Sequence, residues 1–172
     1  ICIDCVQGDR FLDEPQALPT LQMAANLHIP VFVHPVSPLD LTARLARFGH
    51  IGVLMARGTE TAASILALLR AGIFDQLPDL KVVIPMIAAP ALIFAGLADQ
   101  DYRREDAWRG SLPGTLRTRL YIDTMCFDLA SIRFAVNLLG ADHVLLGSDW
   151  PIMPITPRAR IEEILMELDI SD

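Results

Sequence analysis

The chain has 172 residues, a length that suits one domain or part of a larger one. Its formal net charge is −7 and it has no basic stripe, which argues against nucleic-acid binding. Hydrophobic residues make up 52% of the chain. No uninterrupted apolar run approaches the roughly 18 residues that cross a bilayer, so we expect no membrane partner.

Short apolar runs alternate with helix-like segments along the whole chain. We expect strands at 1–6, 31–34, 81–86, 120–124 and 144–147. The helices that we expect lie at 18–27, 39–48, 59–71, 90–99, 129–139 and 158–168. Residues 49–56 fit a short strand or a loop, and 101–119 fit a partly helical excursion. The alternation predicts right-handed βαβ units and a parallel sheet.

The helix at 59–71 has the clearest end signals, with Thr59 as its expected N-cap and Gly72 as its stop. Five strands with their helices fit an open sheet or part of a (β/α)8 barrel. A complete barrel typically needs about 250 residues. We therefore expect an α/β fold of the barrel type in which 1–172 form a single, incomplete domain.

Two of the expected strands end in side chains that bind metals. The strand at 31–34 ends in His34, which Pro35 follows, and the strand at 144–147 leads into Asp149. Ligands and catalytic groups gather at the carboxyl ends of parallel strands, and imidazole and carboxylate are zinc ligands. We expect His34 and Asp149 at one edge of the sheet. The simpler alternatives are a partly satisfied loop histidine and an aspartate that caps a turn.

Other residues near the strand ends carry weaker signals. Asp123 ends the strand at 120–124 and is a secondary pocket candidate, and Met125 and Cys126 follow it toward the same mouth. Trp150 could wall a pocket, although packing at the rim is the simpler interpretation. We expect three further histidines to be solvated: His28, His50 and His143.

The cysteines do not suggest a disulfide framework, because Cys2, Cys5 and Cys126 are odd in number. Cys2 and Cys5 have CxxC spacing but lie among apolar residues. We expect both to be core cysteines in a reducing compartment, which indicates a cytoplasmic protein.

Three stretches together resemble a known family: FLDEPQALPTLQMAANLHIPVFVHP, GIFDQLPDLKVV and YIDTMCFDLASIRFAVNLLGADHVLLGSDWP. They are similar to the amidohydrolase-2 group of metal-dependent hydrolases and decarboxylases, which includes the aminocarboxymuconate-semialdehyde decarboxylase-like enzymes. The resemblance covers about 11–151. It implies a (β/α)8 barrel with a divalent metal, often zinc. His34 matches the mid-chain metal ligand of the family, and Asp149 matches the aspartate of its last strand, a metal ligand able to act as a base.

The chain departs from the family in three places. The HxH or ExH metal pair of the first strand has no counterpart, so the chain resembles only the later βα units of the barrel. Met86 stands where the family has a histidine that handles proton transfer, and methionine is neither an acid nor a base. The chain also stops soon after its last strand. With only His34 and Asp149 as ligands, we expect the chain as given to bind metal weakly or not at all.

Three interpretations of function stay open at this point. The resemblance implies an enzyme, either a hydrolase or a non-oxidative decarboxylase of a small carboxylic or aromatic acid. A catalytically inactive relative that serves as a structural or interaction domain is the alternative, favoured by Met86 and the missing pair. An incomplete chain of a true enzyme is the third. An open barrel edge and the apolar composition predict an oligomer, most simply a homodimer.

Overall fold

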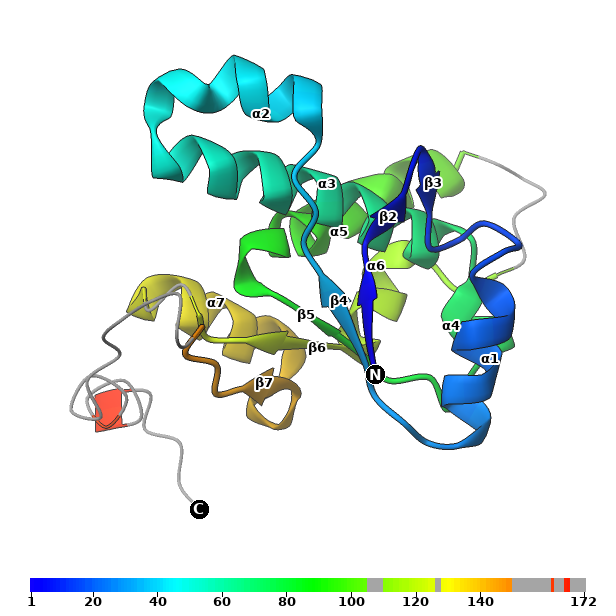
Figure 1. The fold of residues 1–172 in the computed structure, drawn as a ribbon. Coiled ribbons are helices and arrows are strands. Elements are labelled where there is room, and N and C mark those ends of the chain that lie inside the picture. The colour runs from blue at the N-terminus through cyan, green and yellow to red at the C-terminus, as the bar shows by residue number, and fades with distance from the viewer. Residues whose placement is uncertain (105–109, 126–127, 150–161, 163–165, 168–172) are drawn as a thin grey trace.

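The computed structural model describes residues 1–104, 110–125, 128–149, 162 and 166–167, and these residues form an α/β fold around a parallel sheet (Figure 1). The strands of this sheet, in spatial order, are β1 (Cys2–Asp4), β4 (Val31–His34), β5 (Val82–Ile84), β6 (Leu120–Asp123) and β7 (Val144–Leu145). Every neighbouring pair is parallel. The spatial order equals the chain order, which is the order of strands in a (β/α)8 barrel.

Helices connect the strands of the sheet. The α-helices are α1 (Leu18–Asn26), α2 (Leu39–Leu45), α3 (His50–Arg70), α4 (Ile73–Gln76), α5 (Pro90–Tyr102), α6 (Pro113–Leu116) and α7 (Leu129–Leu139). In the part of the chain that the structure describes, four single turns of 3-10 helix accompany them: η1 (Ala46–Phe48), η2 (Met86–Ala88), η3 (Arg117–Arg119) and η4 (Ala141–His143). After β1, a small antiparallel hairpin joins β2 (Val6–Gln7) to β3 (Arg10–Phe11).

The two faces of the sheet differ in burial. In β4, Val31 and Val33 are buried against the helices, whereas Phe32 is 47% exposed and His34 is also exposed. Alternate side chains of a strand point to opposite faces, so one face of β4 packs in the core and the other lies open. The core between the sheet and the helices contains Leu21, Ile65, Leu68, Val82, Ile84, Leu120 and Ile122, all fully buried.

The sequence prediction was wrong about where α3 begins. Residues 50–56, expected as a strand or a loop, are its first two turns, and Thr59 lies inside the helix with its hydroxyl donating to the carbonyl of Met55. The sequence did not predict these two turns as helix, because glycine lowers helix propensity. The structure shows why glycine is present: a Cβ at Gly52 would collide with the carbonyl of Leu45, and one at Gly58 would collide with that of Ile87. The first half of α3 therefore packs closely against α2 at Gly52 (Figure 1) and against η2 at Gly58.

Smaller corrections concern the ends of the strands. The strand expected at 1–6 divides into β1 and the hairpin strand β2. The strand at 81–86 ends at Ile84, because Pro85 leads into a 3-10 turn, and β7 is only two residues long. The helix at 129–139 is confirmed, with the Asp128 carboxylate accepting from the Ser131 amide at 2.9 Å. The helix expected at 158–168 lies almost wholly outside the described residues.

Helix α3 is long and apolar enough to cross a membrane by length and composition, the one such helix in the described part of the chain. Its apolar residues have another explanation in this fold. Ala62, Ile65 and Leu68 are buried and belong to the core beneath the sheet. We therefore interpret α3 as a core helix.

Candidate functional site

The open carboxyl ends of the strands surround a cavity of about 440 Å³. Among the described residues, four polar side chains lie on its wall, each from a different element or strand exit: His34, Arg57, Asp123 and Asp149. The rest of the wall is mostly apolar and includes Phe32, Leu54 and Ile87. The prediction that His34 and Asp149 lie at the same end of the sheet is confirmed, because parallel strands bring their carboxyl ends to one edge.

His34 is the last residue of β4 and is held at both its backbone and its ring. The Cys5 amide donates to the His34 carbonyl at 2.9 Å, and the His34 Nδ1 lies 3.1 Å from the Asp4 Oδ1. Asp4 is the last residue of β1 and stands directly opposite His34 in the parallel ladder. Asp4 was not among the predicted site residues, although it is a carboxylate at a strand exit, the same signal that singled out Asp149.

Asp149 lies in the loop that follows β7, with its side chain exposed on the cavity. Its backbone has a φ of 52°, in the left-handed region that aspartate and asparagine tolerate better than most residues. The loop is tied to the neighbouring strand, because the Gly147 amide donates to the Thr124 hydroxyl at 3.1 Å. Gly147 also lets Asp123 approach, since a Cβ there would lie 2.9 Å from the Asp123 Cβ.

Asp123 lies on the cavity wall and forms hydrogen bonds to the segments that follow two neighbouring strands, β5 and β6. Its Oδ1 accepts from the backbone amides of Met86, at 2.9 Å, and Met125, at 3.2 Å. Burial raises the pKa of this carboxyl, and the nearby charge of Asp149 raises it further, whereas the two amide hydrogen bonds oppose the shift. The net shift of the pKa is upward, so Asp123 holds its proton more strongly than a solvated aspartate does. A cavity-facing carboxyl of this kind can hold and transfer a proton.

Met86 follows β5 at the expected place, but its side chain does not form the cavity wall. The side chain is only 4% exposed and packs in the core, while the adjacent Pro85 and Ile87 line the cavity. An apolar surface therefore occupies the part of the wall where the resemblance implied a histidine. Met86 contributes only its amide, which orients Asp123.

The other residues singled out from the sequence have mixed outcomes. Met125 lines the cavity, as expected, whereas Cys126 and Trp150 lie outside the described residues. His28 and His50 are exposed, in agreement with the prediction.

His143 and Cys2 contradict the sequence predictions. His143 is half-buried: its Nδ1 lies 2.8 Å from the Leu120 carbonyl, and its ring stacks on Tyr121 with the centroids 4.3 Å apart. Cys5 is buried as expected, but Cys2 is exposed. Cys2 pairs with Phe32 in the ladder and so lies on the open face.

Arg57 is the second functional candidate that the sequence analysis missed, because it lies in the unpredicted first half of α3. Its guanidinium donates to the Pro35 carbonyl at 3.1 Å, immediately after His34. It brings a positive charge to a wall that otherwise carries the carboxylates Asp123 and Asp149. A planar guanidinium in this place can bind a carboxylate ligand through paired hydrogen bonds.

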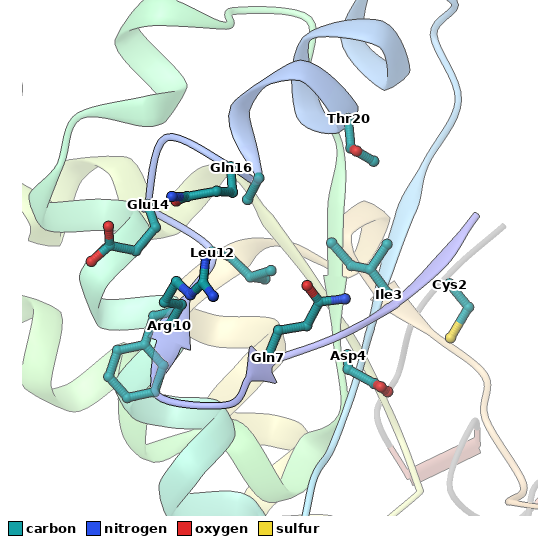
Figure 2. A pocket seen from close by; sticks show the side chains of 11 residues that line it. Cys2, Ile3, Asp4, Gln7, Arg10, Leu12, Glu14, Gln16 and Thr20 are labelled. Carbon is teal, nitrogen blue, oxygen red and sulfur yellow. The ribbon is translucent and has the colours of Figure 1, made fainter.

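A second cavity, of about 380 Å³, lies between β1, the β2–β3 hairpin and the start of α1 (Figure 2). Its wall includes Arg10, Glu14 and Asp4. Figure 2 shows that Ile3 points to the opposite side of the strand from Cys2 and Asp4. Asp4 therefore stands between the two cavities, with its carboxylate toward His34.

The donors on the first cavity suit a divalent metal in their chemistry. His34 offers an imidazole nitrogen and Asp149 a carboxylate, both on the cavity wall. Within the described residues, no three or more His, Cys, Asp or Glu side chains form a group that could hold a metal ion. A catalytic zinc takes three protein ligands and one open position. The described donors thus fit a metal and supply part of its coordination shell.

A family model described as Amidohydrolase, Amidohydro_2, matches residues 5–167. The chain belongs to this amidohydrolase family. The γ-resorcylate decarboxylase of Polaromonas sp. is 28% identical over 156 residues, which cover 82% of this amidohydrolase chain and 46% of that protein. The 2-amino-3-carboxymuconate-6-semialdehyde decarboxylase of Dictyostelium discoideum is 26% identical over 159 residues, 89% of this chain and 44% of that protein. The chain spans about half the length of the curated relatives it matches.

Solved structures share the fold of this amidohydrolase chain. The 5-carboxyvanillate decarboxylase of Sphingomonas paucimobilis matches with a TM-score of 0.82 and 20% identity, over 99% of this chain and 52% of that one. A dihydroxybenzoic acid decarboxylase of Polaromonas sp. was solved with bound manganese and the inhibitor 2-nitroresorcinol. It matches with a TM-score of 0.74 and 23% identity, over 94% of this chain and 50% of that one. The predicted family and α/β barrel type are therefore confirmed.

Proposed function

We propose that this chain carries part of the active site of a metal-dependent, non-oxidative decarboxylase that acts on a small aromatic or unsaturated acid. The observation that carries the proposal is the meeting of His34 and Asp149 on one cavity at the carboxyl ends of the strands. The names of the relatives support the reaction class, since those proteins are decarboxylases of resorcylate, carboxymuconate semialdehyde and related acids. The apolar walls of the cavity suit an aromatic ring.

His34 and Asp149 would hold the metal, which when bound supplies a positive centre that polarises and orients the acid. We favour manganese over zinc, because one imidazole and one carboxylate suit either ion and solved relatives contain manganese. Two donors among the described residues predict weak binding of the ion by this chain.

The chain's own residues would perform three tasks around the substrate. Arg57 would pair with a substrate carboxylate beside His34. The apolar wall near Phe32 and Ile87 would exclude water from the ring. Asp123, which lies on the cavity wall and whose carboxyl has a raised pKa, would deliver a proton to the carbon that loses carbon dioxide. The reaction replaces a carboxylate by that proton.

We also propose that the protein acts as an oligomer, most simply a homodimer. Several large apolar side chains lie exposed on its helices, among them Leu39, which is 87% exposed. Met23 of α1 and Leu27, which directly follows α1, border a further hollow with Ile1 and Ile29. Apolar surface of this extent favours association.

The experiment that tests the function is a decarboxylation assay on γ-resorcylate and other hydroxybenzoates in the presence of Mn²⁺. We expect release of carbon dioxide by the unmodified protein and a loss of at least about 100-fold in His34→Ala or Asp149→Asn, because each removes a ligand. His50→Ala is the matched control, since His50 is exposed at the start of α3. Equal rates in His34→Ala and His50→Ala would refute the proposal.

A further inference from the structure

A carboxylate that was not among the predicted site residues and that no comparison singles out contacts the histidine of the site. The Asp4 Oδ1 lies 3.1 Å from the His34 Nδ1. We propose that Asp4 is a positioning residue: it holds the His34 ring with hydrogen on Nδ1 and so presents Nε2 to the metal. This inference rests on the proposed function, in which His34 is a metal ligand.

The backbone fixes this contact independently of the side chains. Asp4 and His34 are direct partners in the parallel β1–β4 ladder, so their side chains emerge on the same face of the sheet. The Cys5 amide, one residue after Asp4, donates to the His34 carbonyl at 2.9 Å. The two strand ends are therefore locked in register, and the carboxylate meets the ring without a long flexible linker.

The chemistry of the two groups determines which ring nitrogen carries the hydrogen. An ionised carboxylate can only accept a hydrogen bond, so the contact requires hydrogen on the His34 Nδ1. Nε2 is then the nitrogen with a free lone pair. A histidine that binds metal commonly donates its other ring N–H to a carboxylate, which fixes the tautomer and the orientation of the ring.

Burial argues that the contact serves orientation rather than stability. The side chains of His34 and Asp4 are 54% and 58% exposed. Exposed ion pairs contribute little to folding. Removing the Asp4 carboxylate should therefore leave the fold intact, which makes its effect on the ring measurable.

The position of Asp4 also distinguishes a positioning role from direct ligation. His34 and Asp149 line the cavity at the strand ends, whereas Asp4 lines the neighbouring cavity beyond β1 (Figure 2). Within the described residues, these three side chains do not form a group that could hold one ion. Asp4 occupies the Nδ1 side of the ring, and Nε2 lies on the other side.

The first arm of the test measures the tautomer without metal. Protein labelled with ¹⁵N-histidine is examined by NMR at about pH 8, above the usual histidine pKa. We expect His34 in the Nδ1–H form, and a shift toward the Nε2–H form in Asp4→Ala. Asp4→Asn, which keeps an acceptor oxygen, should retain the Nδ1–H form. His143 is an internal reference, because its Nδ1 contacts the Leu120 carbonyl and should not respond.

The second arm measures Mn²⁺ binding by electron paramagnetic resonance, with titration into the millimolar range. Asp4→Ala should weaken binding about 10- to 100-fold, the usual effect of removing such a partner. Asp9→Ala is the matched control: Asp9 is an exposed carboxylate in the nearby β2–β3 turn. The control variant should bind like the unmodified protein.

The outcomes separate the inference from the proposed function. An unchanged His34 tautomer in Asp4→Ala, or unchanged Mn²⁺ affinity despite a changed tautomer, would overturn the positioning role. Tighter Mn²⁺ binding in Asp4→Ala would also overturn it. If the unmodified protein binds no Mn²⁺, the proposed function fails, and so does the claim that Asp4 presents the His34 Nε2 to a metal. The NMR measurement still decides whether Asp4 sets the tautomer of His34.

Discussion

Asp123 is the residue in which burial and hydrogen bonding oppose each other most clearly. Desolvation raises the pKa of its carboxyl above the ordinary value of 3.8, and the amides of Met86 and Met125 only partly offset that rise. A group whose pKa is higher in the folded than in the unfolded state binds more protons when folded. Its contribution to stability is therefore complete at low pH and is lost as the pH rises through the folded pKa.

We predict that Asp123→Asn removes this loss of stability with pH. The amide oxygen of asparagine can still accept from the backbone amides of Met86 and Met125, and it carries no charge. Denaturant unfolding between about pH 4 and 7 should show the unmodified protein losing stability, relative to the Asp123→Asn variant, as the pH rises. A stability difference that is constant across this range would contradict the raised pKa.

Arg57 donates a hydrogen bond to the Pro35 carbonyl after β4 and, in the proposed function, also binds the substrate carboxylate. We predict that Arg57→Met weakens the binding of a benzoate-type acid by about 1.5–3 kcal/mol, the usual range for a hydrogen bond to a charged group. The affinity for an uncharged phenol of the same size should change little. Isothermal titration of both ligands checks this, with Arg44→Met as a control at an exposed site of α2. Equal losses for the acid and the phenol would show that Arg57 only anchors the Pro35 loop.

At the scale of elements, α3 and α7 begin in different ways, and single substitutions can show it. Asp128 is a true N-cap of α7, so Asp128→Ala should cost about 1 kcal/mol of stability. Thr59 lies inside α3 and is exposed, so Thr59→Ala should be neutral or raise stability by a few tenths of a kcal/mol. Chemical unfolding of both variants checks the pair. A loss of about 1 kcal/mol in Thr59→Ala would mean that the helix begins there after all.

The sequence predicted the elements whose signals are local. The strand β4 and the helix α7 were predicted with their observed limits, because their apolar patterns are visible in neighbouring residues. The first turns of α3 were not found, because Gly52 and Gly58 reflect close approaches to other parts of the chain. The contact of Asp4 with His34 depends on the register between two strands that are 30 residues apart, which local patterns do not contain.

At the scale of the whole molecule, the sheet is covered by helices on one face and open on the other. Leu39 on the projecting α2 and Met23 on α1 leave apolar surface in contact with water. We predict that the protein associates at micromolar concentration and that Leu39→Asp weakens this association. Sedimentation velocity measures both. A monodisperse monomer throughout that range would contradict the prediction.

The central claim is that His34 and Asp149 share one metal ion at the carboxyl ends of the strands. The most direct measurement is anomalous X-ray diffraction at the manganese edge from crystals grown with Mn²⁺. We expect a peak bonded to the His34 Nε2 and to the Asp149 carboxylate, with Asp4 on the Nδ1 side of the ring. A peak bonded to the His34 Nδ1, or manganese bound only away from these two residues, would contradict it.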